Sequence, residues 1–180
     1  WLIFLCFLFS FIFVVGLVFY YFYFYYQFWS HLNTNSFNHL IEYKSDNIEG
    51  WRGRQVLIHG EFTPYIKKMN SYAIKTEVEL IVTHSYRFPD ETLSNSIVDV
   101  ANYSNHSAGF AIDLNIECEG EYYNSSDIKR KELRQLPSSI QAFINLVRQD
   151  QDISWGGYFN PADPVHFDVP LNKRNAQRYK

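Results

Sequence analysis

The stretch "AIDLNI" at residues 111–116 alternates between apolar and polar side chains, within the longer segment "SNHSAGFAIDLNI" at residues 104–116. Alternation with a period of two is typical of a β-strand that buries one face. We therefore expect a strand here, with its isoleucines and leucine toward the core and Asp113 on the opposite face. His106 lies seven residues before Asp113, and Gly109 between them is a position where the chain can turn.

The remaining patterns predict two helices and two further strands. Apolar residues recur at helical spacing in two stretches, 62–76 and 136–150. In the first of these, Thr63 is the expected N-cap and Pro64 the first helical residue. The strand patterns are "EVELIVTHSY" at 77–86 and "PVHFDV" at 164–169. Together these elements predict an α+β fold, in which helices pack on a small, mainly antiparallel sheet.

The beginning of the chain is strongly apolar. No Asp, Glu, Lys or Arg precedes Glu42, and residues 1–29 are almost wholly apolar and aromatic. A helix of roughly 20 apolar residues can cross a bilayer core, whereas the apolar core of a cleaved signal peptide has only about 7–15. We therefore expect a transmembrane helix over residues 1–29 that anchors the protein to a membrane. A linker over 30–48 and a domain over 49–180 would follow, with the domain outside the cytoplasm, in the periplasm or the extracellular space.

Charge and cysteine content exclude several classes of function. The formal net charge is −3 and we expect no basic patch on the domain, which argues against nucleic-acid binding. Cys6 lies in the apolar segment, so Cys118 is the only cysteine of the predicted domain. A disulfide within that domain and a thiolate metal cluster are therefore both excluded.

The strand patterns suggest a metal site. If they hold, Asp113 and His166 point to the same side of one sheet, and a turn at Gly109 brings His106 back toward them. Two histidines and a carboxylate suit a catalytic zinc, which takes three protein ligands and leaves a fourth position for water. The spacing alone is weak evidence, because the chain has six histidines and a hydrogen-bonded histidine beside a surface aspartate has the same pattern.

The order of the motifs resembles the M15 peptidases, which are D-alanyl-D-alanine carboxypeptidases and related L-alanyl-D-glutamate endopeptidases. That family has Ser-x-His-x-x-Gly-x-Ala-x-Asp, then Trp-Gly-Gly, then an acid three residues before a final histidine. The corresponding segments are "SNHSAGFAID" at 104–113, "SWGGYF" at 154–159 and "DPVHFD" at 163–168. Two further segments are also similar to the family, "VTHSYR" at 82–87 and "LPSSIQAFI" at 136–144.

The resemblance implies a Zn²⁺ ion and a reaction. His106, Asp113 and His166 would bind the metal, which would activate a water molecule and polarise the scissile carbonyl. Asp163 would act as the general base. Many members of the family have Glu at this position, and Asp is one methylene shorter.

The resemblance also implies a substrate, the stem peptides of peptidoglycan. Arg87 would bind a substrate carboxylate or the developing oxyanion, while Ser104 and Trp155 would help to shape the substrate site. A D-alanyl-D-alanine carboxypeptidase is the expected activity, because Arg87 could pair with a free C-terminal carboxylate. Two alternatives stay open, an L-alanyl-D-glutamate endopeptidase and a module that binds zinc or peptide without turnover. They stay open because residues 88–103 depart from the family and Asp163 replaces Glu.

Overall fold

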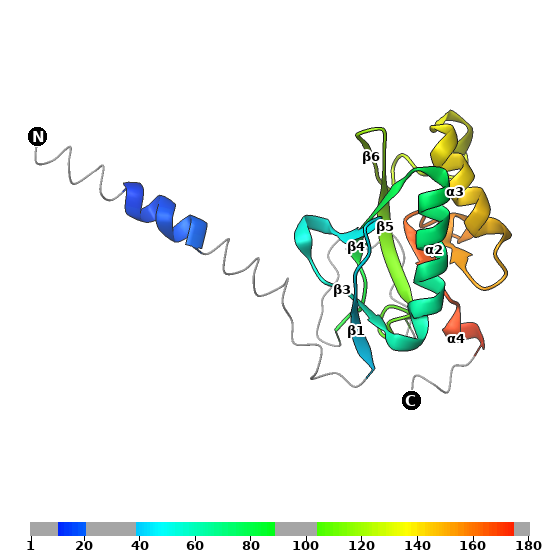
Figure 1. The fold of residues 1–180 in the computed structure, drawn as a ribbon, viewed down its shortest axis with the longest axis horizontal. Helices are drawn as coiled ribbons and strands as arrows, with labels where there is room; N and C mark the ends of the chain where they lie inside the picture. The colour runs from blue at the N-terminus through cyan, green and yellow to red at the C-terminus, as the bar shows by residue number, and fades with distance from the viewer. Residues whose placement is uncertain (1–10, 21–38, 89–103, 175–180) are drawn as a thin grey trace, which may run out of the picture.

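The computed structural model describes residues 11–20, 39–88 and 104–174 (Figure 1). Its strands are β1 (Leu40–Tyr43), β2 (Ile48–Gly50), β3 (Val56–His59), β4 (Glu79–His84), β5 (Ala111–Cys118), β6 (Glu121–Tyr123), β7 (Ser154–Trp155) and β8 (His166–Asp168). Its helices after residue 39 are α2 (Thr63–Thr76), α3 (Ser138–Gln149) and α4 (Leu171–Arg174). Short 3-10 helices lie between them: η2 (Trp51–Gly53), η3 (Gly60–Phe62), η4 (Leu133–Gln135) and η5 (Gly156–Tyr158).

The architecture is α+β, and its main sheet is mixed. The strand order is β2-β4-β5-β8-β7, with β6 paired to β5 at one end. β2 runs parallel to β4, while the other neighbours in this sheet are antiparallel. A parallel pair needs a long crossover, and β3 with α2 supplies it here. β1 and β3 form a separate antiparallel pair, so a strand occupies part of the stretch that we predicted as a linker.

The prediction of an N-terminal transmembrane helix is wrong. The helix described in that region covers residues 11–20, which at 1.5 Å per residue spans about 15 Å, roughly half of a bilayer core. Its side chains are largely exposed, Phe19 by 73%. Among the described residues, no helix has the length and apolar character needed to cross a membrane. The prediction counted apolar residues over 1–29 as a single helix; residues 1–10 and 21–38 lie outside the described part of the chain.

Helices α2 and α3 pack against each other and against the sheet (Figure 1). α2 begins at Thr63, so Thr63 is its first helical residue and Phe62 is the N-cap instead. Pro64 lies in the first turn. α3 buries the residues that its spacing predicts, because the apolar positions recur once per turn. The side chains that α3 contributes to the core are Ile140, Phe143, Ile144 and Val147.

One buried carboxylate joins the two helices. Asp150 follows α3 directly, and its side chain is only 3% exposed. From α2, Lys68 Nζ lies 2.9 Å from Asp150 Oδ2, and the Tyr72 hydroxyl donates a hydrogen bond of 2.8 Å to the same oxygen. Burial would raise the pKa of Asp150, but the Asp152 N–H, Lys68 and Tyr72 together lower it below its usual value.

Asp150→Asn should therefore lower the free energy of unfolding at neutral pH by about 1–3 kcal/mol, since it breaks charged hydrogen bonds to a buried group. A carboxyl whose pKa is depressed by folding stabilises the protein above its unfolded pKa of about 3.9, and that contribution is lost as the pH falls through the folded pKa. Denaturant unfolding of both proteins at pH 7 and at pH 3 measures the effect. The difference in unfolding free energy between the parent and Asp150→Asn should be smaller at pH 3. Asp152→Asn, at a side chain that is 51% exposed, should change the unfolding free energy little at either pH.

Candidate metal centre

Three neighbouring strands place polar side chains in one row across the sheet. Asp113 of β5 is the register partner of His166 of β8 on one side and of His84 of β4 on the other. The neighbouring residues Ile112 and Phe167 are fully buried on the opposite face. The alternation expected from the sequence is thus present in both strands, and it directs Asp113 and His166 to the same face.

A tight turn adds His106 to this row. The Gly109 N–H donates to the His106 carbonyl over 3.0 Å, and the turn ends at Gly109 with a φ of +72°. A Cβ on Gly109 would lie 2.5 Å from the backbone nitrogen of His59, so only glycine fits both the conformation and the space. The turn leaves the His106 side chain buried, at 4% exposure.

The donor atoms of these three residues form a compact triangle. His106 Nε2 lies 3.2 Å from Asp113 Oδ1, and His166 Nδ1 lies 3.0 Å from the same oxygen. The two ring nitrogens are 3.2 Å apart. Ligands of a tetrahedral zinc with bonds of 2.0–2.2 Å lie roughly 3.3–3.5 Å from each other, so the donor set fits one divalent ion.

Outer contacts fix which ring nitrogen faces the triangle. His106 Nδ1 lies 2.7 Å from the Ser85 carbonyl, which can only accept a hydrogen bond, so Nδ1 carries the proton and Nε2 keeps a lone pair in the neutral ring. His166 Nε2 lies 3.5 Å from Asp168 Oδ2, and Asn105 Nδ2 donates to that oxygen over 2.5 Å. Such contacts orient metal-binding histidines.

Charges in the cluster are strongly coupled. Burial would lower the pKa of His166, but the carboxylates of Asp113 and Asp168 outweigh it and raise the pKa to about 10. Burial would raise the pKa of Asp113, but His106 and His166 hold it well below its usual range. Binding of a metal ion to these side chains therefore competes with the binding of protons.

A further carboxylate lies beside the cluster. The pKa of Asp163 is raised by burial and by the negative charge of Asp113. Its Oδ1 atom is buried and has no hydrogen-bond partner among the described residues. Its backbone is fixed, because its N–H donates to the Gly156 carbonyl over 2.9 Å and its carbonyl accepts from the His166 N–H over 3.1 Å. This arrangement suits a group that takes up and releases a proton.

The family profile for D-alanyl-D-alanine carboxypeptidase, named Peptidase_M15_4, matches residues 99–169. That span includes His106, Asp113, Asp163 and His166. This match relates residues 99–169 of the chain to the M15 peptidases.

Comparison with solved structures finds the L-Ala D-Glu endopeptidase ChiX of Serratia marcescens. It is 18% identical to this chain, and the match covers 65% of this chain and 84% of that one with a TM-score of 0.40. Comparison with curated proteins finds no match.

Arg87 and Ser104 lie together beside the His106 turn. Arg87 Nη1 donates to Ser104 Oγ over 3.2 Å, and the Arg87 backbone N–H donates to the His106 carbonyl over 3.2 Å. Trp155 is placed differently, because it is 3% exposed and its Nε1–H donates to the Pro164 carbonyl over 2.7 Å. It therefore supports the turn between Asp163 and His166 from the core side.

Sequence reasoning missed three contacts of this site. The Ser85 carbonyl is a backbone acceptor, so no side-chain pattern could reveal it. Asn105 is next to His106 in the motif, but only the fold shows that it reaches Asp168, 63 residues away. The Phe159 ring lies 5.5 Å from the His166 ring and covers one side of it.

Gly156→Ala should disrupt this site. A Cβ at Gly156 would lie 2.2 Å from the Asp163 carbonyl oxygen and 2.9 Å from His166 Cβ, so the turn must move. We expect a loss of about 1–3 kcal/mol in the free energy of unfolding, as for other overpacked sites, together with weaker metal binding. Thermal unfolding and zinc titration measure both effects.

The matched control is Gly60→Ala. A Cβ at Gly60 has only the His39 carbonyl oxygen within reach, at 3.7 Å, which is ordinary contact. Equal losses in the two variants would show that the close approach at Gly156 is unimportant.

Proposed function

We propose that this chain is a zinc-dependent D-alanyl-D-alanine carboxypeptidase that hydrolyses peptidoglycan stem peptides outside the cytoplasm. The observation that carries the proposal is the triangle of His106 Nε2, Asp113 Oδ1 and His166 Nδ1, with donor atoms 3.0–3.2 Å apart. The match of residues 99–169 to a carboxypeptidase family supports the reaction class. Peptidoglycan lies outside the cytoplasm, which supports the location.

The three residues of the triangle would hold the zinc ion. Zinc, when bound, lowers the pKa of a water ligand toward about 7 and polarises the scissile carbonyl. Asp163 accepts the proton of the attacking water and gives it to the leaving amine. The raised pKa of Asp163 favours its uptake of the water proton, because a base of very low pKa would take up that proton poorly.

Arg87 is the residue that suits the carboxylate of a carboxypeptidase substrate. Its guanidinium is half-buried beside the His106 turn and is held by Ser104 Oγ. A planar guanidinium can bind a carboxylate through two parallel hydrogen bonds, which is the contact that a free peptide C-terminus offers. In an L-alanyl-D-glutamate endopeptidase, the glutamate after the scissile bond also keeps one carboxylate free, so the dependence of the rate on the C-terminal carboxylate is what separates the two activities.

Defined stem peptides test the proposal. The zinc-loaded protein is incubated with a pentapeptide stem that ends in D-alanyl-D-alanine, with the same peptide as its C-terminal amide, and with a longer crosslinked stem. Mass analysis should show loss of one alanine from the free acid and much slower reaction of the amide. Arg87→Gln should remove most of this preference for the acid.

Two other outcomes would replace the proposal. A cut inside the stem, independent of the C-terminal carboxylate, would make the chain an endopeptidase. No product from any peptide, with one zinc bound per chain, would make it a binding module, in which the shorter Asp163 does not reach the water.

A further inference from the structure

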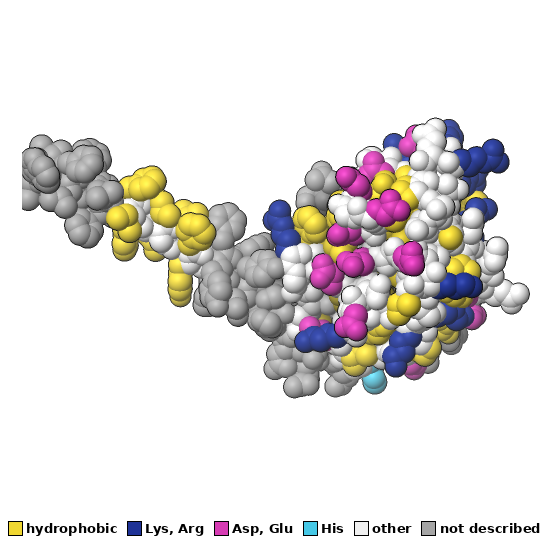
Figure 2. All heavy atoms as spheres, turned by 45° about the horizontal axis from the view of Figure 1, so that its top comes forward, with side chains coloured by type: hydrophobic (Ala, Val, Ile, Leu, Met, Phe, Trp, Pro, Cys, Tyr) yellow, Lys and Arg dark blue, Asp and Glu magenta, His cyan; other side chains and the backbone are white. Residues whose placement is uncertain are grey.

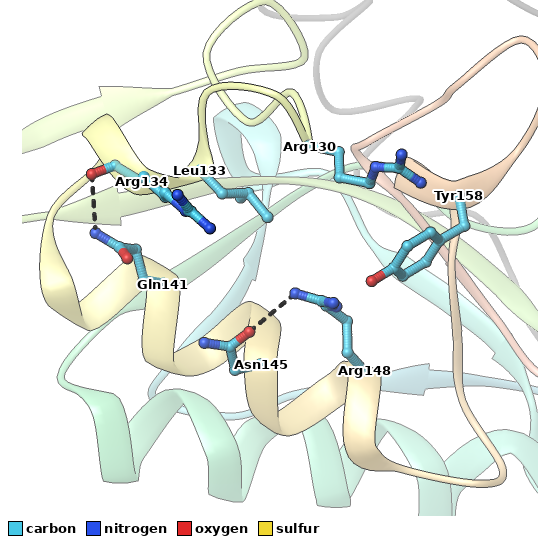
Figure 3. Close-up of a pocket in the computed structure, with 7 residues that line it drawn as sticks. All are labelled: Arg130, Leu133, Arg134, Gln141, Asn145, Arg148 and Tyr158. Atoms are coloured by element: carbon cyan, nitrogen blue, oxygen red, sulfur yellow. Dashed lines mark hydrogen bonds between the residues drawn. The ribbon is translucent and has the colours of Figure 1, made fainter.

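A surface pocket of about 460 Å³ lies away from the metal triangle, along the outer side of α3 (Figure 3). Three segments form it: the loop before η4, η4 itself, and the exposed face of α3 opposite its buried side. Tyr158 of η5 closes one end. The polar side chains that line it are Arg130, Arg134, Gln141, Asn145, Arg148 and Tyr158.

The pocket is strongly basic. Arg130, Arg134 and Arg148 line it from three different segments, and no acidic residue is among the described residues that line it. None of the three guanidiniums lies within 4 Å of a carboxylate in the described part of the chain, in contrast to Lys68 with its two aspartate partners. Figure 2 shows Lys and Arg side chains at the upper right of the domain, while Asp and Glu gather nearer its centre.

The arginines are held in place. The guanidinium carbons of Arg130 and Arg148 lie 5.2 and 5.1 Å from the centroid of the same ring, that of Tyr158. Arg148 also donates to Asn145 Oδ1 over 3.1 Å (Figure 3). Gln141 Nε2 donates to the Leu136 carbonyl over 2.7 Å, which fixes the connection between η4 and α3. Cations on one ring repel each other, and an anion between them would offset that cost.

We propose that this pocket binds a phosphate group, either free or as a phosphodiester of an anionic polymer. Guanidiniums bind carboxylates and phosphates through paired hydrogen bonds, and three of them from different directions suit a tetrahedral oxyanion better than a flat carboxylate. A volume of about 460 Å³ leaves room for the groups esterified to the phosphate. The binding site does not depend on the proposed peptidase activity.

The pocket and the metal triangle share one turn. Tyr158 faces the pocket and packs edge-on against Trp155 at 5.5 Å, while the next residue, Phe159, packs against His166 at 5.5 Å. An anionic chain held at Tyr158 would therefore contact the same turn that positions Asp163. If the proposed function holds, which this consequence alone requires, a polymer bound in the pocket would be tethered to the turn that positions Asp163.

Calorimetric titration of the zinc-loaded protein at low ionic strength tests the proposal. The probes are inorganic phosphate, a short glycerol phosphate oligomer and a triglutamate peptide of comparable charge. We expect both phosphate probes to bind more tightly than triglutamate. The Arg130→Gln/Arg148→Gln double variant should bind them at least about tenfold more weakly, because it removes two of the three cationic side chains that line the pocket. If the oligomer binds more tightly than inorganic phosphate, the ligand is a polymer. If the two probes have equal affinity per phosphate group, the ligand is free phosphate.

Lys129→Gln is the matched control, because Lys129 is exposed, adjacent in sequence and outside the pocket lining. It removes a charge from the same loop and should leave binding unchanged. Phosphate bound at the zinc would persist in the double variant, so only the difference between the two proteins reports the pocket. Three results would overturn the proposal: no binding, equal weakening by Lys129→Gln, or binding of triglutamate as tight as phosphate. Circular dichroism and zinc content confirm that each variant is folded.

Discussion

Asp163→Asn is expected to lower kcat by roughly a hundred- to ten-thousand-fold, the range by which a positioned general base accelerates reactions. The amide has nearly the shape of the carboxylate but cannot accept the proton of the attacking water. Zinc should stay bound, because Asp163 is not part of the donor triangle. Rates on a stem peptide, together with zinc content per chain, measure the two effects separately.

Two companion variants sharpen this prediction. Asp163→Glu restores a carboxylate, at the length that many family members use, and should retain far more activity than the Asn variant. Asp152→Asn changes an exposed aspartate and should leave kcat unchanged. If the Asn variant kept full activity, Asp163 would not be the base, and its raised pKa would be only a result of burial.

His166→Ala is expected to abolish zinc binding and, with it, hydrolysis. It removes one of three donor atoms and leaves His106 as the remaining partner of the Asp113 carboxylate within the triangle. The affinity should fall by more than the roughly 10–100-fold that loss of an outer contact costs. Competition with a chromophoric chelator measures the affinity, and the variant should also lose any rise in melting temperature on addition of zinc.

His84→Ala is the matched control for this second prediction. His84 is also a register partner of Asp113, but its Nδ1 lies 3.8 Å from Asp113 Oδ2 and its side chain is 55% exposed. Its removal should leave zinc affinity within a few-fold of the parent. If both variants lost zinc equally, His84 would also be a ligand, and the triangle alone would not hold the ion.

The elements with a clear period were predictable from the sequence. α3 has apolar residues on one helical face, and β5 alternates over six residues, so burial and local preference agree. Strands β1 and β2 have four and three residues, too short to show a period, and both fall within a polar stretch. Their pairing, including the parallel contact of β2 with β4, depends on residues far away in the chain.

The site shows the same division. Motif order and alternation were enough to name the members of the triangle, because the side chains that do chemistry are visible in the sequence. The contacts that orient these side chains could not be predicted from the sequence. The Ser85 carbonyl has no residue-specific signal, and the hydrogen bond from Asn105 to Asp168 forms only in the completed sheet. The arginine pocket was missed because its three cations are up to 18 residues apart and converge only when η4 packs beside α3.

The pairing of β8 with β5 links folding to chemistry. β8 has only three residues, and it buries Phe167 completely while it presents His166 to Asp113. A slip of β8 by one position would turn the aromatic ring out to water and the imidazole into the core. The free-energy cost of exposing Phe167 therefore disfavours the slipped register. The register that buries Phe167 is also the one that directs His166 toward Asp113, so the most stable sheet has the ligands in place.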